Sequence, residues 1–186
     1  MKKRLLIFVF VVAFAAGTVF AWEPSDLTKY PSCMDSTSWL LNAGVGIGTI
    51  GIGGGYSRFS FPLRVTIDRN IALGDKKLPF FVGGAFGWSS YNETYNNHTW
   101  WYHNFSIGGR FGYHFNWGVD RFDTYAVATA GWIIYAGDGY SSNDIGALLL
   151  GVNAGARYFI SDRFGFWAEA GFSSMSFLDV GLAFKF

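Results

Sequence analysis

The chain alternates between apolar residues and small or polar residues over segments much longer than an ordinary strand. Across residues 100–117 the odd positions are mainly aromatic or aliphatic, whereas the even positions include Gly, Ser, Asn, His and Arg. Successive side chains of a β-strand point to opposite faces, so a period of two predicts a strand with one apolar face. An ordinary strand has roughly five or six residues, so this one is predicted to be unusually long.

Seven other segments extend this pattern and bring the number of predicted strands to eight. Six of them show it clearly: 39–49, 59–68, 80–91, 145–160, 164–173 and 177–186. The segment 124–136 shows it weakly, because Trp132 and Ile134 fall opposite Tyr125, Val127 and Tyr135. We predict that segment chiefly from its neighbours. No helical pattern or domain break interrupts the series, which indicates an all-β chain with one domain from residue 39 to residue 186.

The connections between the predicted strands alternate in kind. Those at 74–77, 118–123 and 161–165 are short and charged, whereas those at 51–57, 93–99 and 137–144 are richer in Gly, Asn, Ser and aromatic residues. The link at 174–176 is minimal. Short turns on one rim and longer loops on the other are typical of outer-membrane barrels. The pattern therefore predicts an eight-stranded antiparallel up-and-down transmembrane β-barrel.

The composition favours a membrane location over a soluble one. The chain has 20 Phe, 10 Tyr and 8 Trp, and only 15% of its residues are charged. Beyond the first twenty residues no apolar run reaches the ~18 residues that a membrane helix needs. The chain is therefore rich in apolar residues but lacks the long apolar run of a membrane helix. Strands whose alternate residues face lipid account for both features. A soluble ligand-binding barrel is the alternative, but it needs a charged outer face, and the residues opposite the apolar set are mostly Gly, Ser and Asn.

Aromatic residues also lie near the ends of several predicted strands. We expect these rings at the two membrane surfaces, where amphipathic side chains are favoured. They are Trp88, Trp101, Tyr113, Trp117, Tyr125, Tyr135 and Tyr158.

The first 21 residues have the features of a cleaved secretory signal. Lys2, Lys3 and Arg4 precede an apolar run, and small residues stand before the expected cleavage after Ala21. A membrane-anchor helix is the alternative, but the run is short for one and no basic cluster follows it. Residues 22–38 are interpreted as a flexible periplasmic segment or a partial plug.

The charge and cysteine content of the exported chain exclude several classes of protein. Without the three basic residues of the signal, the 14 Lys and Arg fall to 11 against 13 Asp and Glu. This balance gives no basic footprint for nucleic acid. Cys33 is the single cysteine of the sequence, so no internal disulfide can form. We interpret it as an unpaired thiol in a loosely ordered segment, and intermolecular pairing is the alternative.

Seven charged residues are predicted to face the lumen of the barrel. A lumen of eight strands is only wide enough for side chains to fill it, so buried charges there must pair. We expect Glu169 to pair with an arginine, and Arg157 or Arg110 are the first candidates. A structural network that closes the lumen is favoured over a narrow polar path for solutes. The seven are Arg64, Asp68, Arg110, Arg157, Glu169, Asp179 and Lys185.

No catalytic or metal site is expected from the three histidines. His98 and His103 lie in or beside one predicted loop, and His114 belongs to the lumen-facing set, without a metal-ligand spacing. A lipid-modifying barrel enzyme would need a nucleophile and a base near the outer rim. His103 and Ser106 fall on opposite faces of a strand, although a pair of His98 with Ser89, Ser90 or Ser141 is conceivable. We expect no enzymatic activity and no cofactor.

The end of the sequence, DVGLAFKF, resembles the β-signal of outer-membrane proteins. It has a polar residue at Asp179, a glycine at Gly181, an aromatic residue at Phe184 and a final aromatic residue at Phe186. From Trp39 onward the chain resembles the small eight-stranded outer-membrane barrels, the class that includes OmpX, OmpW and the OmpA membrane domain. No catalytic motif of the lipid A deacylase or palmitoyltransferase barrels is apparent, and the loops are shorter than those of the adhesin-like members.

The resemblance implies residence in a Gram-negative-type outer membrane, insertion by the assembly machinery that reads the last strand, and contact with outer-membrane lipid. A monomer is favoured. The expected function is that of a non-enzymatic envelope-structural or surface-exposed protein, and a narrow channel for small solutes is the alternative.

Overall fold

The computed structural model describes residues 38–47, 58–59, 61–73, 76–115, 117–172 and 175–186. The predicted signal, the segment 22–37 with Cys33, and the predicted loop 51–57 lie outside these residues. Within them no helix is long and apolar enough to cross a membrane.

Nine strands lie within the described residues. Eight of them are eight or more residues long, and β2 has two residues. The strands are β1 (Trp39–Ile47), β2 (Arg58–Phe59), β3 (Leu63–Leu73), β4 (Lys76–Tyr95), β5 (His98–Phe115), β6 (Phe122–Ala136), β7 (Gly146–Phe159), β8 (Phe164–Phe172) and β9 (Leu178–Lys185).

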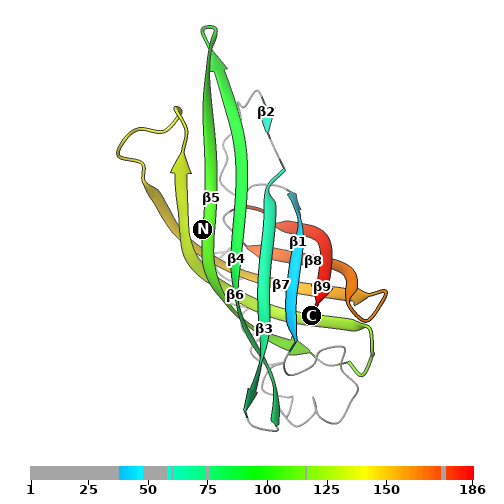
Figure 1. The fold of residues 1–186 in the computed structure, drawn as a ribbon. Helices are drawn as coiled ribbons and strands as arrows, with labels where there is room; N and C mark the ends of the chain where they lie inside the picture. Colours follow the sequence, from blue (N-terminus) through cyan, green and yellow to red (C-terminus); the bar gives the residue numbers. More distant parts are fainter. Residues whose placement is uncertain (1–37, 48–57, 60, 74–75, 116, 173–174) are drawn as a thin grey trace, which may run out of the picture.

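The eight longer strands form a closed antiparallel barrel (Figure 1). The order around the barrel is β1, β3, β4, β5, β6, β7, β8 and β9, and β9 pairs with β1 to close it. β2 adds to the edge of β4, where Phe59 pairs with Tyr91. Closure removes the free edges that an open sheet would expose. The predicted up-and-down barrel fold is therefore confirmed.

The two ends of the barrel differ in their connections. We call the end with Trp39, Phe186 and the turns at 117–121 and 160–163 the turn end. The opposite end, with Asn96, Asn97 and the loop at 137–145, is called the hairpin end. In Figure 1 the β4–β5 hairpin rises well beyond the other strands.

The predicted loop at 93–99 is instead a continuation of two strands. β4 runs to Tyr95, β5 begins at His98, and Asn96 and Asn97 form the turn with φ of 50° and 61°. A two-residue hairpin turn with positive φ at both positions favours asparagine. The polarity of this stretch suggested a loop because the hairpin projects away from the barrel, where neither face needs to be apolar.

Three other predicted boundaries are wrong. The predicted strand 59–68 is divided into β2 and β3 around Pro62, which has no backbone N–H to donate. β3 then continues to Leu73, and β4 begins within the predicted turn 74–77. β6 begins at Phe122, so that Asp123 belongs to a strand rather than to a turn.

The predicted faces hold for most strands. In β3, Val65 and Ile67 are each 39% exposed and point outward, whereas Arg64 and Asp68 are buried in the lumen. β6 is the exception, in agreement with its weak alternation pattern. Trp132 and Ile134 point outward, and Tyr125 and Val127 face the lumen.

Tyr125 and Tyr135 are therefore not members of an outer aromatic girdle. Tyr125 is 1% exposed inside the barrel. Tyr135 alternates onto the same face and stacks on Tyr140 with the ring centres 4.8 Å apart. Trp101, Trp117 and Tyr158 are exposed, as the girdle requires.

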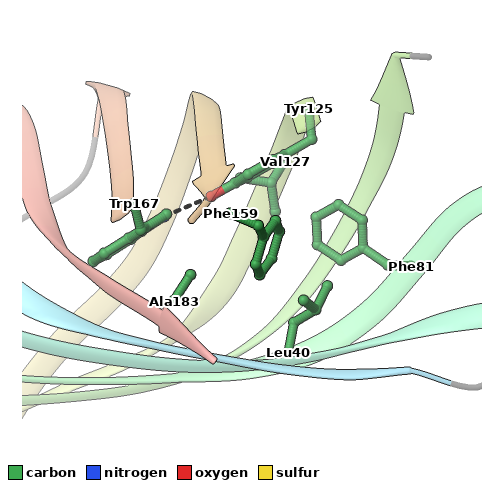
Figure 2. Close-up of a cluster of buried hydrophobic side chains, with 7 residues drawn as sticks. All are labelled: Leu40, Phe81, Tyr125, Val127, Phe159, Trp167 and Ala183. Atoms are coloured by element: carbon green, nitrogen blue, oxygen red, sulfur yellow. Dashed lines mark hydrogen bonds between the residues drawn. The ribbon is translucent and has the colours of Figure 1, made fainter. Parts of the chain in front are cut away.

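Apolar side chains fill the lumen at the turn end (Figure 2). Phe81 and Tyr125 meet edge to face with ring centres 5.5 Å apart. Trp167 closes the cluster and donates from Nε1 to the Tyr125 hydroxyl at 2.7 Å. This packing leaves little room for solvent at the turn end. Its members are Leu40, Phe81, Tyr125, Val127, Phe159, Trp167 and Ala183.

Tyrosines stabilise the hairpin where it leaves the barrel. Tyr91 and Tyr102 stack at 4.6 Å, and Tyr140 meets Tyr102 edge to face at 5.0 Å. The Tyr140 hydroxyl donates to Asn104 Oδ1 at 2.6 Å. Burial and the hydrogen bond with Tyr91 raise the pKa of Tyr140, which keeps this hydroxyl protonated and able to donate.

Candidate functional site: a buried ion network across the lumen

Six of the seven charged residues expected in the lumen meet in one buried network. Each lies on the inward face of its strand, and none is more than 9% exposed. The six are Arg64 and Asp68 on β3, Arg110 on β5, Arg157 on β7, Glu169 on β8 and Asp179 on β9. The seventh, Lys185, lies at the turn end with Nζ 5.5 Å from the centre of the Phe159 ring.

Glu169 is the centre of the first half of the network. Its Oε1 accepts from Arg64 Nη2 at 3.1 Å and from Asn153 Nδ2 at 2.7 Å. Its Oε2 accepts from Arg110 Nη2 and from the Tyr125 hydroxyl at 2.8 and 2.9 Å. Of the two arginines expected beside Glu169, Arg110 is therefore present, and Arg64 takes the place of Arg157.

Arg157 is the centre of the second half. Its Nη2 and Nη1 donate to Asp68 Oδ2 and Asp123 Oδ2, both at 2.8 Å, and its Nε donates to Asn42 Oδ1 at 2.9 Å. The guanidinium also lies over the Tyr125 ring, 4.1 Å from its centre. Three of the five guanidinium N–H donors are thus used by three acceptors.

The two halves are joined by an ion pair between Arg110 Nε and Asp68 Oδ1 at 3.1 Å. Arg64 extends the network toward the hairpin end, where its Nη1 lies 3.2 Å from Asp179 Oδ2. The Ser176 hydroxyl donates to the other oxygen of Asp179 at 2.6 Å. Ion pairs therefore link six of the eight long strands, namely β3, β5, β6, β7, β8 and β9.

This arrangement crosses the whole width of the barrel. β3 and β7 stand opposite each other, because three strands separate them in either direction around the barrel. The Arg157–Asp68 pair connects these two strands directly. Because the Arg157–Asp68 pair spans the lumen, no straight path runs through the centre of the lumen.

His114 adds a ring to the network. Its Nδ1 lies 2.8 Å from Asp123 Oδ1, and its Nε2 lies 3.0 Å from Asn70 Oδ1. Three arginines, Arg64, Arg110 and Arg157, face four carboxylates, those of Asp68, Asp123, Glu169 and Asp179. Buried charges are stable when each is paired and hydrogen-bonded, as here.

Several members were not identified from the sequence. Asp123 was assigned to a turn, and Tyr125 to the outer girdle. Asn42 and Asn153 lie on faces that the alternation did assign to the lumen, but only charged residues were selected as candidates. Polar residues of any kind on the inward face would have been the better criterion, because neutral donors also satisfy buried carboxylates.

A cavity of about 20 Å³ lies beside the network on its hairpin side. Its lining includes Arg64, Ser106, Thr129, Met175 and Asp179. Arg64 Nε and Thr129 Oγ1 are buried and have no hydrogen-bond partner within the described protein. A polar space of this size suits an ordered water molecule.

Two of the histidine–serine pairs considered for an enzyme, His103 with Ser106 and His98 with Ser90, are not brought together. Ser106 is buried in the lumen, whereas the His103 ring stacks on Trp88 and Trp101. His98 pairs with Tyr95 near the tip of the hairpin. Ser90 lies five residues down the same strand from Tyr95, which corresponds to about 16 Å. Among the described residues no group of three His, Cys, Asp or Glu side chains could hold a metal ion.

Comparison with known proteins gives a fold-level similarity only. No family model matches the chain, and no curated protein matches it. The N-terminal β-barrel domain of Pseudomonas aeruginosa OprF is 13% identical with a TM-score of 0.48, covering 82% of this chain and 98% of that one. The Yersinia pestis outer membrane protein Ail is 12% identical with a TM-score of 0.45, covering 82% of this chain and 100% of that one. At these values the similarity does not bear on activity.

Tyr125 offers a test of the network by a single hydroxyl. Tyr125→Phe removes a donor to Glu169 and the acceptor of Trp167, and should lower the free energy of unfolding by about 2 kcal/mol. Tyr158→Phe is the matched control, because Tyr158 is 51% exposed on the outside, and it should change stability by less than about 0.5 kcal/mol. Urea unfolding in detergent micelles measures both. Equal losses would contradict the role assigned to Tyr125.

Proposed function

We propose that this chain is a non-enzymatic integral protein of the outer membrane, with an envelope-structural or surface-exposed role and a lumen closed by the ion network. The observation that carries the proposal is the inverted distribution of polarity. The outside of the closed barrel exposes large apolar side chains on every long strand, such as Val82, Ile107 and Leu148, while the inside holds the ionised groups. A soluble barrel has the opposite arrangement.

Lipid is the medium that this outer surface suits. A patch of exposed apolar side chains that encircles the protein would drive aggregation in water. In a bilayer, backbone groups must be paired within the protein, and closure of the barrel meets that requirement. Exposed aromatic side chains lie on both sides of the apolar band, Trp101 on one side and Trp117 and Tyr158 on the other. These positions suit the two headgroup regions of a bilayer.

The closed lumen favours a structural or surface role over transport. Arg157 and Asp68 connect opposite walls, and the apolar cluster around Phe81 and Phe159 fills the turn end. A solute would have to break several buried ion pairs in order to pass. The cavity beside Arg64 has room for a water molecule, not for a column of them.

Planar-bilayer recording on the purified protein tests the closed lumen. We expect no steady single-channel events, because no path free of the network crosses the barrel. Steady events from protein that is demonstrably folded would contradict the closed lumen and favour a narrow channel. Gel mobility before and after boiling provides the test of folding, since an intact barrel migrates differently from the unfolded chain. A band that does not shift on boiling would contradict the membrane barrel itself.

A further inference from the structure

Beyond the buried network, the charged residues are divided unequally between the two ends of the barrel. By their positions in the strands and turns, the basic residues of the turn end are Arg69, Lys76, Lys77, Arg121 and Arg163, and its acidic residues are Asp120 and Asp162. The hairpin end carries Glu93, Asp138 and Asp144, with Arg58 as the basic residue within the described part of the chain. One rim is therefore basic and the other acidic.

The arginines of the turn end are exposed and form no ion pairs within the described part of the chain. These residues are Arg69, Arg121 and Arg163. Arg121 Nη1 donates one hydrogen bond, to the Ile160 carbonyl at 3.4 Å. Asp120 and Asp162 are their neighbours in sequence, yet the guanidinium groups do not pair with them. The acidic residues of the hairpin end are used differently. Asp138 accepts from the Trp101 backbone N–H at 2.7 Å, and Asp144 from that of Ser141 at 3.1 Å.

The basic rim also lies next to exposed aromatic side chains. The Arg69 guanidinium is 5.0 Å from the centre of the Trp39 ring, and Trp39 is 37% exposed. Trp117 and Phe186 are more exposed still, at the same end of the barrel. Aromatic rings favour the headgroup level of a bilayer, and arginine side chains extend from there toward the phosphate groups.

We propose that the turn-end rim, formed by Arg69, Arg121 and Arg163, binds the phosphate groups of anionic phospholipids. The inference rests on the proposed membrane function and names the lipid chemistry that one rim selects. Guanidinium groups suit phosphate because they donate two parallel hydrogen bonds. In an outer-membrane barrel the short turns face the periplasm, so the leaflet in contact with this rim is the phospholipid leaflet.

Electron spin resonance with spin-labelled lipids measures this contact directly. The protein is reconstituted in phosphatidylcholine that contains a trace of a spin-labelled lipid. The fraction of label in the motionally restricted layer around the barrel is then compared between spin-labelled phosphatidylglycerol and spin-labelled phosphatidylcholine. We expect phosphatidylglycerol to be favoured roughly two- to fivefold, as expected for a few exposed basic residues near the surface. The ratio of the two occupancies should fall toward one in 1 M salt, because the Debye length is then only about 3 Å and exposed charges are screened.

Variants then assign the preference to this rim. The triple variant R69Q/R121Q/R163Q should lose most of it, whereas R69K/R121K/R163K, which keeps the charge but not the parallel hydrogen bonds, should keep part of it. Arg58→Gln, at the opposite end, should leave it unchanged. Equal occupancy by the two lipids in the unsubstituted protein would overturn the rim proposal, and so would a preference that survives in the triple glutamine variant. Absence of any restricted lipid around folded protein would instead overturn the membrane function.

Discussion

Glu169→Ala is expected to lower the free energy of unfolding by about 3–5 kcal/mol, the usual loss when one partner of a buried ion pair is removed. Glu169 accepts hydrogen bonds from Arg64, Arg110, Tyr125 and Asn153. Its removal leaves two buried guanidinium groups with less compensating charge and two neutral donors without an acceptor. The closed lumen predicts that conductance stays nearly unchanged in the protein that remains folded, because Arg157 still spans the barrel.

Urea unfolding in micelles, followed by tryptophan fluorescence, measures the loss of stability. Glu93→Ala is a matched control, because Glu93 accepts one hydrogen bond from Tyr102 at 3.3 Å in the hairpin and lies outside the network. It should lower stability by less than about 1 kcal/mol. A large change in conductance with stability intact would count against a structural network.

A double-variant cycle separates charge from packing. Glu169→Gln keeps the size of the side chain but removes its charge, and Arg64→Gln removes one of the cations that it faces. The two changes together should destabilise the barrel by less than the sum of the single changes, because the double variant leaves fewer unpaired charges. Additive losses would show that Arg64 and Glu169 do not stabilise each other, despite the 3.1 Å distance between them.

The sequence predicted which side chains enter the lumen better than it predicted how they pair. Alternation alone assigns Arg64, Asp68 and Glu169 to the inward face, because a side chain in a strand has only two directions to choose from. Pairing depends on strand tilt and stagger across the barrel, which no local pattern contains. Arg157 reaches Asp68 on the opposite wall, 89 residues away in sequence, and so leaves Glu169 to Arg64 and Arg110.

The errors in β6 have a related cause. The prediction of strand faces from the sequence depends on a difference in polarity between an apolar outer face and a polar inner face. Near the turn end the lumen is filled by an aromatic cluster, so Tyr125 and Val127 are apolar residues on the inward face. The difference in polarity between the two faces of the strand is therefore lost where apolar side chains fill the lumen. Asp123 was missed for the complementary reason, because an aspartate beside a charged turn does not reveal by itself that it lies inside the barrel.

Changing Phe186 to aspartate, or deleting it, should strongly reduce the amount of barrel inserted in the outer membrane. Phe186 and Trp39 exchange two backbone hydrogen bonds, at 2.8 and 3.0 Å, where β9 closes against β1. The Phe186 side chain is 64% exposed and points away from the lumen, so it is available for recognition and then for contact with lipid. The resemblance of Asp179, Gly181, Phe184 and Phe186 to the β-signal implies that assembly machinery reads this strand.

The measurement is the folded, heat-modifiable fraction in isolated outer membranes, compared with refolding of the same variant into detergent micelles. Phe61→Asp is a matched control, since Phe61 is 63% exposed and lies outside the β-signal. If Phe186 is read during assembly, its replacement should reduce insertion in cells far more than refolding in micelles, whereas Phe61→Asp should affect both to a similar degree. Normal insertion of the Phe186 variant would refute the β-signal. Equal losses in cells and in micelles would show that Phe186 acts through barrel closure alone.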